Sequence, residues 1–134
     1  MQGAFDAAVA FDGVNDLLIV GNNDGLNNLM PSRNFSLGIG VWVKPQTTSG
    51  KQVLFTTSPE ETDNGFELSL DGQTIRFETR NGSFSAQSSN VIQAGEWQHV
   101  MVLLTSGYVS PFFDLRTVGL YHNGVVESLS LIHI

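Results

Sequence analysis

The chain lacks cysteine, has few basic residues and contains no long apolar run. None of its 134 residues is cysteine, which excludes disulfide frameworks, zinc–thiolate sites and cysteine nucleophiles and leaves the compartment undetermined. Six lysines and arginines stand against thirteen acidic residues, giving a net charge of −7, so we expect no nucleic acid as a partner. No apolar run approaches the roughly 20 residues that span a bilayer, so we expect no membrane insertion.

Helical signals are also missing. No segment shows helical periodicity for more than a turn, and only 14% of the residues are charged. Glycine, asparagine, serine and threonine are plentiful, which is typical of short strands joined by many turns. A chain of this length suits one domain with its own core. We therefore predict an all-β fold, an antiparallel two-sheet β-sandwich or jelly roll.

The clearest strand covers residues 35–44, FSLGIGVWVK. Apolar residues occupy every second position from Phe35 to Val43, and a period of two predicts one buried face. Trp42 stands on the other face. Pro45 has no backbone N–H to give to a strand ladder, so we expect the strand to end before it.

The clearest hairpin covers residues 65–79, GFELSLDGQTIRFET. Two alternating runs flank Asp71-Gly72, a dipeptide typical of a two-residue type I′ turn. Such a turn pairs Glu67 with Arg76 on an outer face and keeps the apolar side chains together on the other face.

Further candidate strands follow at regular intervals. They are residues 4–12 paired with 17–20 across a turn at Asp12-Gly13, then 52–57, 83–87, 97–105 and 117–122, the last turning at Asn123-Gly124. Residues 97–105 are apolar on both faces, which predicts a central strand covered on both sides. Residues 106–115, SGYVSPFFDL, are predicted to form a longer connection.

Five motifs follow one another along the chain. They are AFDGVNDLLIV at 10–20, LGIGVWVKP at 37–45, GFELSLDG at 65–72, GEWQHVMV at 95–102 and LYHNGVV at 120–126. In this order they resemble the laminin-G-like jelly roll of the concanavalin A-like lectin/glucanase superfamily. The resemblance implies two stacked sheets in a non-catalytic module of secreted or cell-surface proteins. Such modules bind glycans or extracellular protein partners and often hold a calcium ion.

The chain departs from this family in two places. The segment SGYVSPFFD replaces a short turn, and the strands that the family carries beyond LYHNG are missing. Residues 129–134 read LSLIHI, which the transposase adapter CTGTCTCTTATACACATC encodes in frame, so we predict a sequencing artefact there. A genuine edge strand is the alternative. We then expect a single domain over residues 4–128, incomplete at its C-terminus, from a larger protein with other domains and a signal peptide outside this piece.

Oxygen-rich loops are the candidates for calcium, which takes six to eight oxygen ligands. Asp12, Asn15 and Asp16 supply three such side chains within one turn, and the resemblance favours the same region. The alternative is ordinary turn chemistry, in which Asx side chains bond to the local backbone.

Glycan binding calls for exposed aromatic rings, because sugar faces stack on rings while hydroxyls take fixed hydrogen-bond partners. Trp42 is one candidate, with a core position on the second face as the alternative. Tyr108, Phe112 and Phe113 in the inserted segment are further candidates, since they would form an exposed partner-binding tip.

Catalytic signatures are missing from the sequence. Glucanases of the resembled fold carry a carboxylate pair in an E-x-D-x-E run, and this chain has no such run, no nucleophile elbow and no phosphate-binding glycine loop. We therefore predict a non-enzymatic extracellular or cell-surface recognition module, which binds carbohydrate or matrix with the assistance of calcium. A protein-binding adhesion or spacer module is the first alternative. A glycoside hydrolase that uses Glu67 or Glu78 is the second.

Overall fold

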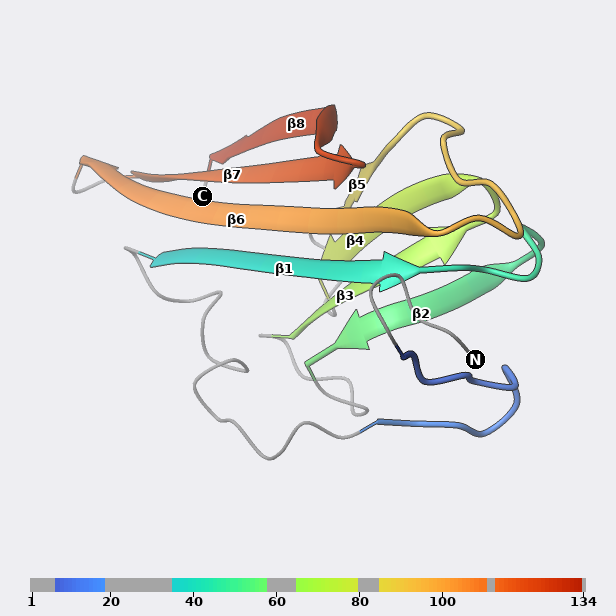
Figure 1. Ribbon diagram of the computed structural model, residues 1–134. Helices are drawn as coiled ribbons and strands as arrows, with labels where there is room; N and C mark the ends of the chain where they lie inside the picture. The colour runs from blue at the N-terminus through green and yellow to red at the C-terminus, as the bar shows by residue number, and fades with distance from the viewer. Residues whose placement is uncertain (1–6, 19–34, 58–64, 80–84, 111–112, 134) are drawn as a thin grey trace.

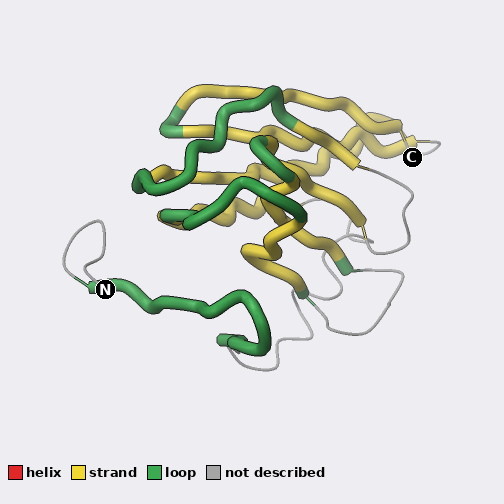
Figure 2. Tube along the Cα trace, turned by 90° about the vertical axis from the view of Figure 1, so that its right-hand side faces the viewer, coloured by secondary structure: helices red, strands yellow, loops and turns green. Residues whose placement is uncertain are grey.

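The computed structural model describes residues 7–18, 35–57, 65–79, 85–110 and 113–133. Every regular element in these ranges is a β-strand, and none of them holds a helix long and apolar enough to cross a membrane. The strands form two antiparallel sheets of four strands each, stacked as two layers (Figure 1, Figure 2). The predicted all-β sandwich of jelly-roll type is confirmed.

The first sheet has the strand order β1-β6-β7-β8. Its strands are β1 (Phe35–Val43), β6 (Gln98–Ser110), β7 (Phe113–His122) and β8 (Val125–His133). β6 lies between β1 and β7, as expected for a strand that is apolar on both faces. The predicted turn between β7 and β8 is confirmed, because Asn123 and Gly124 both have positive φ, at 49° and 81°, as a type I′ turn requires.

The second sheet has the strand order β2-β3-β4-β5. Its strands are β2 (Lys51–Thr56), β3 (Phe66–Asp71), β4 (Thr74–Thr79) and β5 (Ser85–Gln87). β5 lies against β7 and β8 of the first sheet. Consequently β1 and β2 are the two sheet edges at the opposite side of the sandwich.

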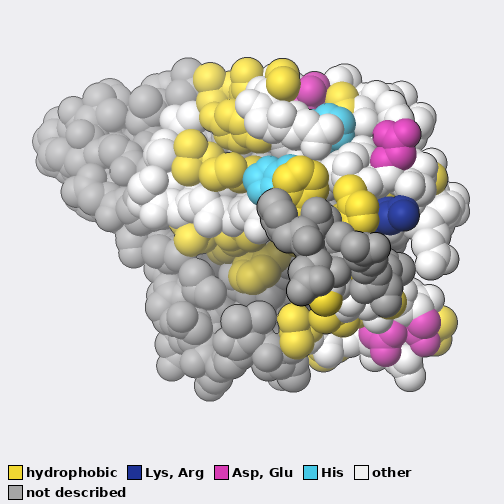
Figure 3. Space-filling model, viewed as in Figure 1, with side chains coloured by type: hydrophobic (Ala, Val, Ile, Leu, Met, Phe, Trp, Pro, Cys, Tyr) yellow, Lys and Arg dark blue, Asp and Glu magenta, His cyan; other side chains and the backbone are white. Residues whose placement is uncertain are grey.

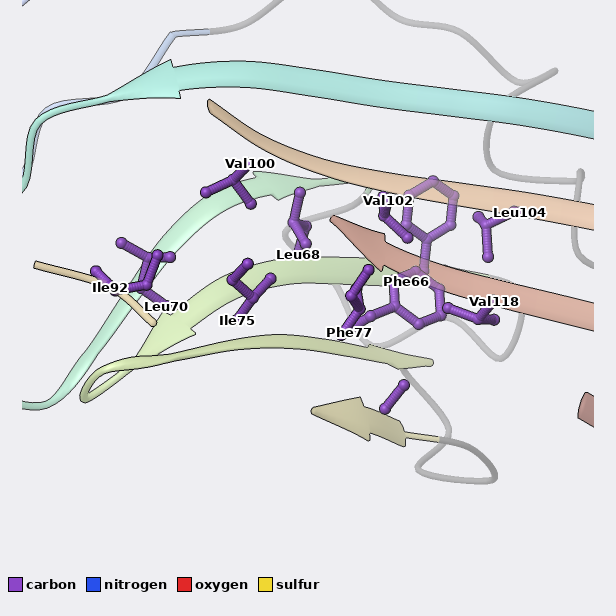
Figure 4. Packing of buried hydrophobic residues seen from close by; sticks show 12 residues of the cluster. Phe66, Leu68, Leu70, Ile75, Phe77, Ile92, Val100, Val102, Leu104 and Val118 are labelled. Carbon is purple, nitrogen blue, oxygen red and sulfur yellow. The ribbon is translucent and has the colours of Figure 1, made fainter. Parts of the chain in front are cut away.

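The core lies between the inner faces of the two sheets (Figure 4). Its fully buried members come mainly from β3, β4, β6 and β7: Phe66, Leu68, Leu70, Ile75, Phe77, Val100, Val102, Val118 and Leu120. The ring of Phe66 lies between those of Phe55 and Phe77, with centroids 6.0 and 5.6 Å away. Each such buried side chain stabilises the fold by about 1.5–3 kcal/mol.

The β3–β4 hairpin turns one residue later than the sequence predicted. Asp71 pairs with Thr74 across a loop of Gly72 and Gln73. Only Gly72 of these two has a positive φ, at 61°, which fits a type II′ turn and contradicts the predicted type I′ turn. Thr74 closes the turn, since its Oγ1 donates a hydrogen bond to the carbonyl oxygen of Asp71 at 2.8 Å.

The later turn changes the cross-strand partners but not the faces. Glu67 stands opposite Glu78, and Arg76 stands opposite Ser69. The predicted Glu67–Arg76 pair is therefore wrong. Because the register moved by an even number of residues, every side chain kept its predicted face.

Residues 106–115 do not form the predicted connection. β6 continues to Ser110 and β7 begins at Phe113, with Tyr108 paired with Asp114 between them. The backbone ladder continues along both strands although apolar and polar residues do not alternate clearly in the sequence there. The inserted segment therefore extends the β6–β7 hairpin.

The predicted first strand pair is wrong over the described residues 8–18, which contain no strand. Val9, Phe11 and Leu17 are 67%, 51% and 74% exposed, because no neighbouring strand of the described chain covers them. This segment runs outside the two layers (Figure 1, Figure 2). Residues 4–6 and 19–20 of the two predicted strands lie outside the described residues.

The final strand includes the residues whose origin the sequence puts in question. Residues 129–133 form the end of β8 and pair with β7. Their derivation from an adapter stays a prediction, as do the domain limits that depend on it.

Gln98 ties the turn before β6 to the first sheet. It is 2% exposed, and its Nε2 donates hydrogen bonds to the carbonyl oxygens of Gln93 at 2.6 Å and Glu96 at 3.2 Å. Its Oε1 accepts a hydrogen bond from the backbone N–H of Gln93 at 3.0 Å, and Nε2 of His122 lies 3.0 Å away. The polar residue of the GEWQHV motif thus has a structural role.

Candidate functional site

The outer face of the first sheet carries an apolar surface around Trp42. We call it the Trp42 face, and it consists of Trp42, His99, Met101, Leu103, Tyr121, Gly38, Gly40 and Gly119. The strand register brings these residues together, with Trp42 opposite His99 and Gly40 opposite Met101 across β1 and β6. Across β6 and β7, Met101 stands opposite Tyr121. Three strands of one sheet therefore position the surface.

Glycines let neighbouring side chains lie flat on this face. A Cβ atom added to Gly40 would lie 2.9 Å from Nε2 of His99. One added to Gly119 would lie 2.9 Å from Cε2 of Tyr121. The imidazole and phenol rings therefore occupy space that a side chain at either glycine would need, and the face stays low and flat.

Trp42 is 43% exposed on this face, so the alternative of a buried second-face residue is wrong. Its ring centroid lies 5.3 Å from that of His99, with the rings tilted by 59°, a favourable arrangement for an aromatic pair. His99 and Tyr121 are half-buried. Figure 3, in the view of Figure 1, shows hydrophobic side chains in patches across the molecule, with a histidine beside one of them.

The central strand is therefore not covered on both sides as predicted. Its inward residues Val100 and Val102 are fully buried, whereas Met101 and Leu103 on the Trp42 face are half-buried. The apolar residues on the second face of β6 therefore form part of a solvent-exposed surface. They do not belong to a second core.

None of the eight residues that make up the Trp42 face is Asp, Glu, Lys or Arg, although the chain has a net charge of −7, and the exposed Lys44 follows just beyond the end of β1. The polar groups of this face are the imidazole of His99, the hydroxyl of Tyr121 and the indole N–H of Trp42. A flat, uncharged surface with one exposed indole ring can stack the apolar face of a sugar ring, while the polar groups offer hydrogen bonds to hydroxyls.

The outer face of the second sheet is instead charged. Nζ of Lys51 lies 2.9 Å from Oε1 of Glu78 and forms a second ion pair with Oε1 of Glu67. Glu67 is 6% exposed. Arg76 adds a contact of 3.5 Å to Oε2 of Glu78. Two carboxylates on adjacent strands are thus held around one ammonium group.

These ion pairs oppose a catalytic role for the carboxylates. The hydrogen bond from Lys51 lowers the pKa of Glu78, and hydrogen bonds to Glu67 and Glu78 raise the pKa of Lys51. A glycosidase acid needs the reverse, a raised carboxyl pKa that keeps its proton near neutral pH. Glu78 is held ionised and paired.

The predicted calcium ligands form a local turn. Oδ1 of Asp12 accepts hydrogen bonds from the backbone N–H groups of Val14 at 2.8 Å and Asn15 at 3.4 Å, and Oδ2 of Asp16 accepts one from Asp12 at 2.8 Å. This is the Asx-turn arrangement that the sequence left as an alternative. No three His, Cys, Asp or Glu side chains in the described ranges could jointly hold a metal ion. The described residues therefore fit a calcium ion poorly, and the site stays a prediction.

The backbone of Tyr108 lies far from Trp42. Tyr108 is nine residues beyond His99 on β6, about 30 Å at strand spacing. The side chains of Tyr108 and Phe113, and all of Phe112, fall outside the described part of the chain. Their role as a partner-binding tip stays a prediction.

Sequence reasoning did not single out His99 or Tyr121. The alternation within each strand shows which residues share a face, and glycines 38 and 40 visibly share theirs with Trp42. The missing information was that β1 pairs with β6, from which the Trp42–His99 contact follows directly.

Comparison with known proteins gives one match. A laminin-G-type family model, described as the concanavalin A-like lectin/glucanases superfamily, matches residues 12–128 of the 134. No curated protein matches the chain in a sequence search. The matched range contains both the Trp42 face and the charged cluster around Lys51. Because the match spans most of the chain and both sheets, the chain belongs to the concanavalin A-like lectin/glucanase superfamily.

Proposed function

We propose that the chain is a non-catalytic recognition module that binds a neutral glycan through the Trp42 face. The observation that carries this proposal is the exposed indole ring of Trp42 on a flat, uncharged sheet face, beside the ring of His99. The superfamily includes lectins, as its description states. Binding modules of this kind are usually found outside the cell, and we extend that location to this chain.

The chemistry of the face suits a sugar ring. An indole stacks on the C–H groups of one pyranose face. The glycines beside Trp42 have no side chains, which leaves room for the sugar ring to lie flat on the sheet. The imidazole of His99 and the hydroxyl of Tyr121 can exchange hydrogen bonds with hydroxyl groups at the edge of such a ring. Because no residue of the Trp42 face is charged, stacking on it does not require a sulfated or carboxylated sugar.

Hydrolysis is the less favoured function of the same superfamily. The best-placed carboxylates are Glu67 and Glu78, which stand opposite each other on β3 and β4. Glu67 is nearly inaccessible, and Lys51 pairs with both. Glu67 therefore lacks the access that attack on a sugar requires, and Glu78, whose pKa the hydrogen bond from Lys51 lowers, lacks the raised pKa of a proton donor.

Protein binding is the second candidate, favoured by a specific observation. Val126 of β8 is 52% exposed. Its register opposite Tyr121 places it on the same side as the Trp42 face. The apolar surface therefore extends beyond what one sugar ring covers, and large exposed apolar patches are typical of protein interfaces.

A glycan array tests the proposal. Labelled protein should bind neutral glycans, and the Trp42→Ala variant should lose that binding while keeping the thermal unfolding midpoint of the parent. An array without neutral hits would contradict glycan binding. If the parent chain then binds an extracellular protein and Trp42→Ala does not, the protein-binding alternative would take its place.

A further inference from the structure

The backbone of His99 is anchored toward β7 and not toward β1. In an antiparallel sheet the N–H and C=O groups of one residue point to the same neighbouring strand. Both groups of His99 bond to Asn123, which follows the end of β7. Trp42 stands directly opposite His99 on the other side. Trp42 and His99 are thus a non-hydrogen-bonded pair, the kind whose side chains come closest together.

Asn123 bonds to both backbone groups of His99. Its N–H donates a hydrogen bond to the carbonyl oxygen of His99 at 2.9 Å, and its Oδ1 accepts one from the N–H of His99 at 2.9 Å. The ladder of paired residues between β6 and β7 ends one position earlier, at Val100 and His122. A side-chain amide oxygen therefore takes the place that a backbone carbonyl oxygen would hold if the ladder continued.

Position 123 has to meet two requirements at once. It lies in the turn between β7 and β8 with a φ of 49°, a conformation that glycine, asparagine and aspartate adopt most readily. It also supplies an oxygen acceptor to His99, which glycine cannot do. Glycine alone would serve the turn, so the side chain of Asn123 has a role beyond the turn itself.

We propose that Asn123 is a positioning residue for the Trp42 face, which anchors the backbone of His99 and thereby sets the imidazole beside the indole ring. The two ring centroids lie 5.3 Å apart, and Nε2 of His99 occupies the space above Gly40. Asn123 acts through His99, because its two hydrogen bonds reach the backbone of that residue. Its effect on glycan binding rests on the function proposed above, whereas its effect on the His99 ring does not.

Two substitutions separate the acceptor oxygen from the turn. Asn123→Gly keeps the positive φ and loses the acceptor, whereas Asn123→Asp keeps both. The thermal midpoint of Asn123→Gly should stay within about 5 °C of the parent, as expected for the loss of one exposed hydrogen bond. Asn123→Asp is the matched control, and it should behave as the parent does in the measurements that follow.

The NMR signals of the imidazole C–H groups of His99 report on its ring without any ligand. The ring current of Trp42 shifts these signals, and Trp42→Ala gives their positions without that shift. In Asn123→Gly the signals should move toward the Trp42→Ala positions, while in Asn123→Asp they should stay at the parental ones. Parental signals in a folded Asn123→Gly variant overturn the proposal.

Hydrogen exchange in the unmodified chain keeps the test decisive if Asn123→Gly does not fold. The backbone amide of His99 should exchange with deuterium more slowly than that of Gly124 in the neighbouring turn. Equally fast exchange at the two amides overturns the anchoring of His99 by Asn123.

Glycan titration then tests the consequence for binding. Asn123→Gly should bind the glycan at least about threefold more weakly than the parent, and Asn123→Asp should bind it with parental affinity. Parental affinity in Asn123→Gly, together with weakened binding by Trp42→Ala, overturns the positioning role and leaves the proposed function standing. Parental affinity in Trp42→Ala instead removes the proposed function, and the His99 signals alone then decide whether Asn123 positions the ring.

Discussion

The rings of Trp42 and His99 lie 5.3 Å apart, and the same His99 ring lies over the bare Cα of Gly40. The register explains both contacts, because His99 is paired with Trp42 and Gly40 is the preceding residue on that face of β1. The position of the exposed indole therefore depends on a histidine that in turn depends on a glycine. These contacts make the Trp42 face sensitive to small substitutions that leave the core intact.

Gly40→Ala should separate binding from stability. The new methyl group would lie 2.9 Å from Nε2 of His99, so the imidazole must move away from the face and release the ring of Trp42. Because the ring is the far end of a flexible side chain, the unfolding free energy should change by less than about 0.5 kcal/mol. Glycan affinity should fall at least about threefold, or about 0.7 kcal/mol. Ser36→Ala, on the same face of β1 but distant from Trp42, is the control. Parental affinity in Gly40→Ala would show that His99 does not position the site.

Gln98→Ala should destabilise the sandwich by about 2–4 kcal/mol. The substitution removes a nearly inaccessible amide that bonds to the backbone of Gln93 and Glu96, and leaves those backbone groups without their partner. Gln93→Ala is a close control, because Gln93 takes part through its backbone only. Urea unfolding of the two variants measures the difference, and equal stabilities would contradict the structural role of the GEWQHV motif.

Lys51→Met should destabilise the protein at neutral pH by about 1–2 kcal/mol, because it leaves the buried Glu67 opposite Glu78 without a shared cation. Lys44→Met, at an exposed lysine, should have no measurable effect. Thermal unfolding of both variants at pH 7 makes the comparison. A loss of the same size in both would show that only net charge matters.

The effect of Lys51→Met should depend on pH with a definite sign. Folding lowers the pKa of Glu78, so its contribution is present above the unfolded carboxyl pKa of about 4.3 and is lost as the pH falls through the folded value. Folding raises the pKa of Lys51, so its contribution is present below about pH 10.4 and is lost as the pH rises through the folded value. The difference between parent and variant should therefore be largest between about pH 5 and pH 10. A difference that persists undiminished at about pH 3 would contradict the ion-pair account.

Calcium should leave the thermal midpoint unchanged. The turn of Asp12 and Asp16 uses two of its carboxylate oxygens for backbone N–H groups, and an oxygen that already accepts such a hydrogen bond is less available to a calcium ion. The measurement compares unfolding in millimolar calcium with unfolding in a chelator. A stabilisation that disappears in Asp16→Asn would establish the calcium site that the resemblance implies.

Much of the fold was predictable because its determinants are local. The alternation from Leu37 to Val43 and across the β3–β4 hairpin sets which residues face the core, and that parity was correct in both segments. The register of the β3–β4 hairpin was not predicted correctly, because both Asp71-Gly72 and Gly72-Gln73 can form the two central residues of the turn. The β-branched Thr74 is better placed at the start of a strand.

The candidate site was only half predictable. Trp42 was identified from its position off the core face, but its partner His99 lies 57 residues later in the chain. Periodicity fixes the face on which a residue lies and not the strand that lies beside it. The predicted first strand shows the same limit, since Val9 and Phe11 alternate as a strand requires while no described neighbour pairs with them.

The most direct measurement is a titration of the parent chain and of Trp42→Ala with the neutral glycan that binds best on an array. Val53→Ala, at an exposed residue on the outer face of the second sheet, is the control. The proposal predicts that Trp42→Ala weakens binding at least about tenfold, or about 1.4 kcal/mol, while Val53→Ala binds as the parent does. Undiminished binding by a folded Trp42→Ala variant would contradict the assignment of the Trp42 face as the glycan site.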